Sequence, residues 1–374
     1  RAARPILLNL CVITARVGLA HAGATPGHAL AWGVFAAGVV QLVWLMAALK
    51  REGVVLRLPR PRLSPQIRRL LKLFFPVALG AGVYQVNLVI DVIIASLLPT
   101  GSISFLYYAD RVNQLPLGVV GIAVGTALLP LLSRQVKSGE GEAALESQNR
   151  AIEYVLFLAL PAAAALITLS VPVVTVLFER GAFSAADAQA TAQALAAFAI
   201  GLPAYVLVKV LAPGYFARED TATPIKIGIV AMVLNVVLSL ILMNFLAHVG
   251  LALATATSAW FNAAMLAQGL KQRGHLVLDQ RLRRRVARML LCSAALAVAL
   301  VFLAGGLEGP LAGDQAMRFA ALAALVVAGM GLYGGLAQAT GAGRLGVLWR
   351  SHGGNLGGSW GGAQGRAWGG GGLY

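Results

Sequence analysis

The chain has 374 residues, of which 59% are hydrophobic and only 12% are charged, and its formal net charge is +16. Soluble proteins carry about 25% charged residues, so this composition, with a mean hydropathy of +0.78, excludes an ordinary soluble domain. Several apolar runs exceed the roughly 20 residues that cross a hydrocarbon core about 30 Å thick. The sequence therefore predicts an all-α fold, a multi-pass membrane bundle of helices.

Apolar runs between charged or turn-rich breaks predict ten spans. In chain order they cover residues 5–24, 29–49, 70–98, 113–133, 151–178, 188–212, 224–246, 248–270, 286–306 and 318–340. The runs at 70–98 and 151–178 are longer than a perpendicular crossing needs, which allows tilt or a kink at Pro76 and Pro161. The chain opens with Arg1 rather than Met, which favours a fragment, and residues 344–374 form a Gly-rich tail that we expect to be disordered.

The basic residues alternate between the two sides of the predicted spans. Residues 50–72 hold eight Lys or Arg and residues 271–288 hold seven, whereas the loops on the opposite side contribute only Arg111, Arg180 and Arg318. Because Lys and Arg favour cytoplasmic loops, both termini of this chain are predicted to be cytoplasmic. The positive charge then lies where it can meet anionic lipid headgroups, and a nucleic-acid partner is not expected.

Asp91 and Lys209 are the ionisable residues inside predicted spans that are hardest to dismiss, whereas Arg16, toward the outer end of the first span, could snorkel. A charge at membrane depth costs at least about 2.5–3.5 kcal/mol, so each is a functional candidate unless a partner or snorkelling explains it. Lys209 is close to the inner end of its span, so snorkelling and function both remain open for it. Asp91 has a short side chain, which favours function.

Polar residues near Asp91 recur at helical spacing. Asn87 precedes it by four residues, and Asn235 and Ser239 repeat that spacing in a later span, followed by Thr255 in the next. One carboxylate with amide and hydroxyl oxygens is the ligand type of a hard cation such as Na⁺. Hydrogen bonding between helices by small polar residues is the alternative.

No motif indicates an enzyme. The five His lie in or beside loops without HExxH spacing, and neither GxSxG nor a P-loop is present. Cys11 and Cys292 are far apart in apolar runs and are interpreted as packing residues. Small residues and proline breaks within spans instead favour a transporter that changes shape.

The stretch from Val83 to Glu140, which contains YYADRVNQLP, resembles the MurJ (MviN) family of lipid II flippases, in the multidrug/oligosaccharidyl-lipid/polysaccharide exporter superfamily. The likeness continues through LFERGAFSAADA (177–188) and VKVLAPGYFAREDTATPIKIGIV (208–230) and reaches about residue 343. It implies a flippase that moves lipid II, the undecaprenyl-pyrophosphate-linked peptidoglycan precursor, to the outer leaflet of the bacterial inner membrane by alternating access. Another exporter of the superfamily and a non-transporting membrane scaffold remain the alternatives.

The resemblance also implies an organisation of the chain. Family members have fourteen spans, so the ten predicted here correspond to the fifth to the fourteenth. Residues 1–69 then end the N-lobe, residues 70–285 form a C-lobe of six spans, and residues 286–343 supply two spans that form a hydrophobic groove for the lipid tail. A monomer is expected.

Site residues follow from the matching positions. Arg111 of YYADR matches a cavity arginine that meets the pyrophosphate, Lys209 matches another basic position, and Asp110 is expected to orient Arg111 or to cap the helix that follows. Gln114 stands where some relatives carry an acid. The sodium site of the family matches the cation-binding candidates Asp91, Asn235, Ser239 and Thr255, and no other cofactor is implied.

Overall fold

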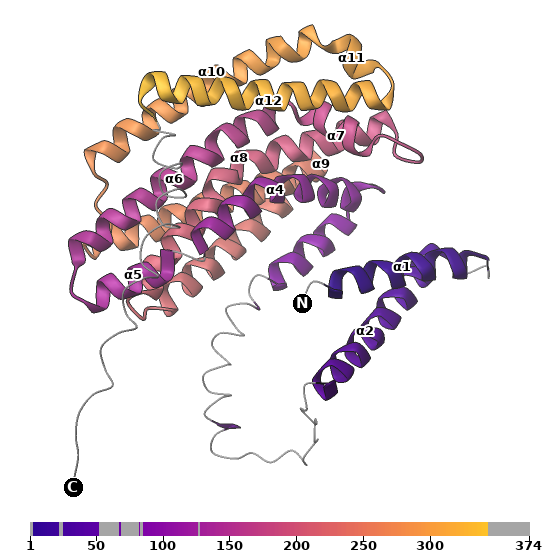
Figure 1. Ribbon diagram of the computed structural model, residues 1–374, viewed down its shortest axis with the longest axis horizontal. Coiled ribbons are helices and arrows are strands. Elements are labelled where there is room, and N and C mark those ends of the chain that lie inside the picture. The colour runs from indigo at the N-terminus through magenta and orange to yellow at the C-terminus, as the bar shows by residue number, and fades with distance from the viewer. Residues whose placement is uncertain are drawn as a thin grey trace, which may run out of the picture. The chain divides into compact units, whose positions relative to one another are not determined.

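The computed structural model describes residues 3–21, 25–51, 67–68, 82, 85–125 and 128–342. Every element within these residues is helical, which confirms the predicted all-α class (Figure 1). The chain divides into two compact units, Arg1–Phe74 and Phe75–Tyr374, and each is described by itself. The expected tail at 344–374 and Pro76 lie outside the described residues.

The first unit contains α1 (Ala3–His21) and α2 (Pro26–Arg51), which lie against each other. They approach closely at Gly33, where an added Cβ would lie 3.0 Å from the Cα of Val12. Ala29 and Ala37, one helical turn to either side of Gly33, are fully buried. Small residues at this spacing let two helix backbones pack tightly, which is how helices associate in lipid.

Within the described residues, the second unit contains a helix at Gln85–Ser96 and nine labelled helices. These are α4 (Ser102–Gly125), α5 (Leu128–Lys137), α6 (Gly141–Thr168), α7 (Ser170–Phe178), α8 (Ala185–Phe216), α9 (Ala222–Gln272), α10 (Gln280–Gly306), α11 (Glu308–Ala312) and α12 (Gln315–Thr340). Among the described residues six helices are long and apolar enough to cross a membrane, namely α2, α6, α8, α9, α10 and α12.

Helix α9 is a hairpin of two helices rather than one rod. Its 51 residues would extend about 76 Å if straight, more than twice the hydrocarbon thickness. Ala247 has non-helical angles, φ 46° and ψ −128°, and an added Cβ on Gly250 would lie 2.5 Å from the carbonyl oxygen of Leu242. Arg273, just beyond the end of α9, bonds Asp220, just before its start, at 2.5 Å. The break falls at the residue that separates two of the predicted spans.

The fourth predicted span begins earlier than the sequence indicated. Residues 99–112 were expected to form a loop, but α4 begins at Ser102 and places Asp110 and Arg111 in its third turn. The preceding turn is short because Gly101 adopts φ +101° and its carbonyl accepts the backbone N–H of Phe105 at 2.9 Å. The proposal that Asp110 caps the helix that follows is therefore wrong, because no helix begins there.

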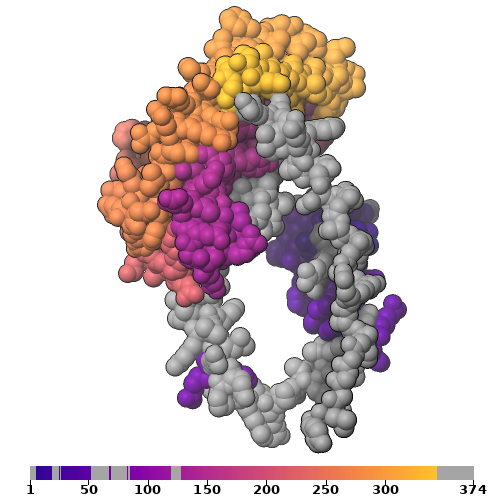
Figure 2. All heavy atoms as spheres, turned by 60° about the vertical axis from the view of Figure 1, so that its left-hand side comes forward, coloured from indigo at the N-terminus to yellow at the C-terminus, as the bar shows by residue number. Residues whose placement is uncertain are grey.

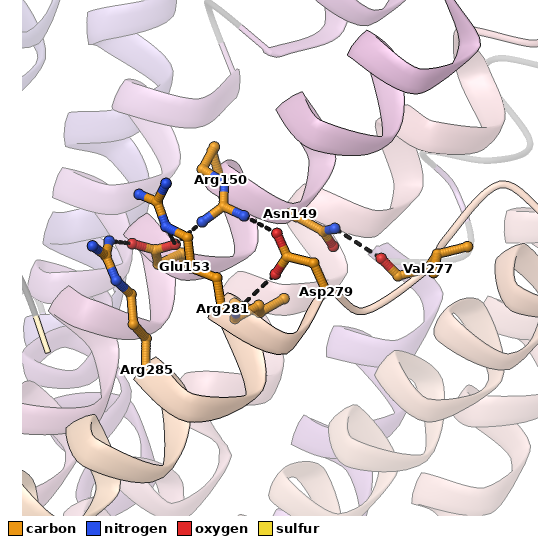
Figure 3. A network of polar contacts seen from close by, with 8 residues as sticks. Asn149, Arg150, Glu153, Val277, Asp279, Arg281 and Arg285 are labelled. Carbon is orange, nitrogen blue, oxygen red and sulfur yellow. Dashed lines mark hydrogen bonds and ion pairs between the residues drawn. The ribbon is translucent and has the colours of Figure 1, made fainter.

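Ion pairs among a cluster of charged side chains join the start of α10 to α6 (Figure 3). Glu153 accepts from Arg150 and Arg285 and lies 3.6 Å from Arg281, while Arg150 also contacts Asp279. Asp279 additionally caps the N-terminus of α10, since its Oδ1 accepts the backbone N–H of Leu282 at 2.7 Å. The start of α10 is thus fixed by ion pairs on one side and by its own cap on the other.

Helices α10 and α12 lie side by side at one edge of the second unit, in orange and yellow (Figure 2). Leu300 and Leu325 are buried in the main apolar cluster of the unit. Leu300 lies against Gly329, where an added Cβ would meet its side chain at 3.3 Å. The outward faces of both helices are apolar, as Phe302 and Met330, which are 76% and 72% exposed, illustrate.

Candidate functional site

Asp91 lies at the centre of a polar contact between two helices. The amide of Asn87, one turn before it, donates to Asp91 Oδ2 at 2.9 Å, and the amide of Asn235 in α9 donates to Asp91 Oδ1 at 2.9 Å. Asn235 also approaches Asn87 Oδ1 at 3.3 Å. Each carboxylate oxygen therefore accepts one amide N–H, and the two helices are joined through a single acid.

Two oxygen atoms in this region have no hydrogen-bond partner among the described residues. They are Asn235 Oδ1 and Ser239 Oγ, and both residues are almost completely buried, at 2% and 0% exposure. Ser239 follows Asn235 by one helical turn, so the two lie on the same face of α9. Buried oxygens without partners are costly, and a bound cation would satisfy them.

Thr255 lies in the second half of α9, and its hydroxyl donates to the carbonyl of Leu251 at 3.0 Å. Leu251 is buried with Ile94 and Ala95, and Val236 packs against this cluster. Leu251 lies on the same helical segment as Thr255. Ile94 lies on the helix of Asp91, and Val236 follows Asn235 in the first half of α9. Asp91 and Asn235 are thus hydrogen-bonded directly. Thr255 is brought near them only because its helical segment packs against theirs in the neighbouring apolar cluster.

This donor set fits a hard monovalent cation better than a transition metal. It offers one carboxylate with amide and hydroxyl oxygens and contains no His or Cys. Across the part of the chain that the structure describes, no group of three or more His, Cys, Asp or Glu residues could hold a metal ion.

Gln114 bridges Asp110 and Arg111 on α4. Its amide nitrogen donates to Asp110 Oδ2, and its amide oxygen lies 3.4 Å from Arg111 Nη1. Asp110 and Arg111 are neighbours in sequence, yet they make no direct ion pair among the described residues. Sequence reasoning did not foresee this bridge, although the spacing of Gln114 from Asp110, four residues on a helix, is the signal that could have predicted it.

Arg111 lies on an exposed face of α4. Its guanidinium is 4.8 Å from the ring centroid of Tyr107, a cation–π distance. Tyr107 and Leu115, one turn to either side, are 54% and 66% exposed, while Ala109 and Val112 are buried against α8. At 1.5 Å per residue Arg111 stands about 13 Å along α4 from its first residue, Ser102.

Lys209 is an exposed residue of α8, between the buried Val210 and the half-buried Val208. Its position is four residues before Pro213. Among the described residues no hydrogen bond or ion pair joins Lys209 to Arg111 or to Asp110, so the three predicted substrate-binding residues divide into a pair on α4 and a separate lysine on α8.

Sequence reasoning missed Glu153 altogether. It lies three residues inside the predicted span 151–178 and is 9% exposed, with arginines from α6 and α10 around it. A carboxylate just inside a span, opposite the arginine-rich segment 281–288, was the signal available. Its neighbours make it a structural residue that joins helices.

Comparison with known proteins gives consistent matches. The family model described as lipid II flippase MurJ matches residues 1–310. A probable lipid II flippase MurJ of Rhizobium tropici is 44% identical over 338 residues, which is 89% of this chain and 63% of that protein. The corresponding protein of Rhizobium meliloti (strain 1021) is 42% identical over 352 residues, covering 93% and 66%. The chain therefore spans less than two thirds of the length of these two relatives.

A solved structure shares the fold. It is titled lipid II flippase MurJ, inward closed conformation, and it matches with a TM-score of 0.71 over 94% of this chain and 68% of that chain. The sequence identity is 22%, so this likeness speaks for the fold alone.

Proposed function

Because the chain belongs to the MurJ family, we propose that the protein moves lipid II from the inner to the outer leaflet of the bacterial inner membrane, for peptidoglycan synthesis. The observation that carries the proposal is Arg111, an exposed guanidinium in the third turn of α4 whose neighbouring exposed residues, Tyr107 and Leu115, are aromatic or apolar. Such a charge is expensive in lipid, so it requires a polar partner. No observation favours a drug exporter or a scaffold.

Arg111 is proposed to bind the pyrophosphate of the substrate. A guanidinium presents several N–H donors in a planar fork that matches phosphate oxygens, and these charge-assisted bonds are about twice as strong as neutral ones. Gln114 and the ring of Tyr107 hold the guanidinium on one side of α4. Asp110 acts through Gln114, which limits its role to positioning. Lys209 is proposed as a second basic contact for the headgroup.

We propose that Na⁺ binds as a coupling ion at Asp91, Asn235, Ser239 and Thr255. The support is chemical: a carboxylate, two buried oxygens without partners, and a hydroxyl lie on helices that meet at this level. Binding there would link the helix at Gln85–Ser96 to both halves of α9. A bound cation would therefore couple the positions of three segments, which is what an ion-driven change of shape requires.

The proposed topology has ten spans of a fourteen-span, two-lobe transporter, with both termini of this chain cytoplasmic. The hairpin of α9 supports it, because one long helix supplies two crossings. We propose that α10 and α12, whose outward faces are apolar, form the groove for the lipid tail. The transporter is proposed to act as a monomer.

Complementation tests the proposal. The complete gene that contains this sequence is expressed in cells from which the resident lipid II flippase is depleted. Rescue of growth with normal cell shape is the expected result. Lysis of cells that carry the protein in the membrane at normal amounts would contradict it and would favour the scaffold.

A further inference from the structure

Prolines interrupt the backbone hydrogen bonding of α6 and α8. Proline has no N–H, so the carbonyl four residues before it loses its helical partner, and the ring pushes the helix into a bend that also weakens the next bond. The helices keep their course through Pro161 in α6 and through Pro203 and Pro213 in α8. In lipid the freed carbonyls need donors from elsewhere.

Phe157 is the residue whose carbonyl Pro161 leaves without a partner, since it lies four positions earlier. The hydroxyl of Tyr333, on α12, donates to that carbonyl at 3.0 Å. Tyr333 is 6% exposed, and its ring lies 5.3 Å from the ring of Phe157. The bond is therefore shielded from water, and ring packing directs the hydroxyl onto the carbonyl.

The two prolines of α8 show a related arrangement, one residue along. The amide of Gln148, on α6, donates at 2.8 Å to the carbonyl of Val210, three residues before Pro213. The indole N–H of Trp260, on α9, donates at 3.0 Å to the carbonyl of Ile200, three residues before Pro203. In all three cases the donor is a side chain of a different helix.

We infer that Tyr333, on α12, is a positioning residue that stabilises α6 at Pro161 through its hydrogen bond to the Phe157 carbonyl. Gln148 and Trp260 likewise stabilise α8 at Pro213 and Pro203 through their bonds to carbonyls three residues before each proline. A single hydroxyl bond can be released without unfolding either helix. The position of α12 thereby sets the bend of α6. Release of this bond accompanies the change between inward-open and outward-open states. This part of the inference rests on the proposed function.

Tyr215 provides a matched control within the same unit. Its buried hydroxyl donates to the carbonyl of Leu266 at 2.8 Å, again between helices. Leu270, four residues after Leu266, is not a proline, so this carbonyl keeps its helical N–H. The variants Y333F and Y215F each remove one phenol hydroxyl from a carbonyl, and only Y333F removes it from a carbonyl that a proline has freed.

The test is a distance measured along α6 in the full protein. Spin labels at the exposed positions Glu146 and Ile167 lie on either side of Pro161, about 32 Å apart on a straight helix, after both native cysteines are replaced. We expect Y333F to double the width of the distance distribution or to add a second population, whereas Y215F leaves it unchanged.

The P161A variant completes the test, because it restores the backbone N–H that proline removes. In that background Y333F should have no effect on the distribution. A Y333F distribution that superimposes on the parent, or that broadens equally with and without P161A, would overturn the inference. If P161A does not fold, the comparison of Y333F with Y215F decides alone. The distance does not depend on lipid II, so failure of the proposed function would leave the result readable.

Discussion

The amide nitrogen of Asn235 lies 2.9 Å from Oδ1 of Asp91, although 144 residues separate the two in the chain. This contact brings α9 against the helix at Gln85–Ser96 and leaves Asn235 Oδ1 without a partner among the described residues. It gives the proposed cation site its central pair.

Replacing Asp91 by Asn tests the cation site. The D91N variant keeps the size of the side chain but removes the charge that attracts Na⁺, so we expect any dependence of transport on sodium to weaken at least tenfold in ion concentration, about 1.4 kcal/mol. Transport is measured as rescue across a series of sodium concentrations. The control is N244A, an exposed asparagine of α9 that bonds only its own helix. An unchanged sodium response in D91N would count against the site.

Arg111→Ala is expected to abolish rescue while the protein still inserts into the membrane. The substitution removes the fork of donors for the pyrophosphate and leaves α4 intact, because Arg111 is exposed and its bond to Gln114 and its contact with the Tyr107 ring both lie within α4. Arg111→Lys keeps the charge but not the fork geometry, so it should rescue partially. Membrane levels of each variant are measured alongside growth. Normal growth with Arg111→Ala would refute the assigned role.

Glu153→Gln should lower the stability of the second unit. It leaves Arg150 and Arg285 facing a neutral group, and breaking a largely buried pair costs about 3–5 kcal/mol, reduced here because the arginines are partly exposed. A fall of several degrees in the thermal midpoint in detergent is expected. Glu146→Gln, an exposed glutamate of the same helix, is the control. Equal midpoints for the two variants would argue that the cluster contributes nothing.

The ion pair between Asp220 and Arg273 should make stability depend on pH. Partial burial raises the pKa of Asp220, but hydrogen bonds from Arg273 and Thr223 outweigh it and lower the pKa from 3.8 to about 2. A lowered carboxyl pKa contributes stability above the ordinary value, and that contribution is lost as the pH falls from 4 to 2.

Because Arg273 is exposed, solvent and salt screen the pair, and its contribution to stability at neutral pH is small. Asp220→Asn should therefore lower the midpoint slightly at pH 7, and the difference from the parent should shrink as the pH falls below 4. A difference that persists unchanged at the lowest pH where the protein stays folded would contradict this assignment.

Apolar runs were enough to predict the all-α class and the division of α9 at residue 247, because a hairpin in lipid needs two apolar stretches with a break between them. Apolar runs did not predict the start of α4, because its first three turns include Asp110 and Arg111 and are less hydrophobic than a typical span. Helical hydrogen bonding does not require apolar side chains, so a charged turn can continue a helix that hydropathy would end.

The pairing of polar residues was less accessible from sequence. The spacing of Asn87 and Asp91 predicted one face of one helix, but only the fold decides that Asn235 lies opposite them. The bond from Tyr333 to Phe157 likewise joins residues 176 positions apart, and no local pattern reports it.

The most direct measurement is the amount of lipid II that is accessible from outside the inner membrane. Cells depleted of their own flippase and carrying the complete gene are exposed to an added enzyme that cleaves lipid II in the outer leaflet, beside cells that carry the Arg111→Ala variant at equal protein levels. We predict cleavage at the level of undepleted cells with the natural gene and loss of cleavage with Arg111→Ala. Equal cleavage in both, or none in either, would contradict it.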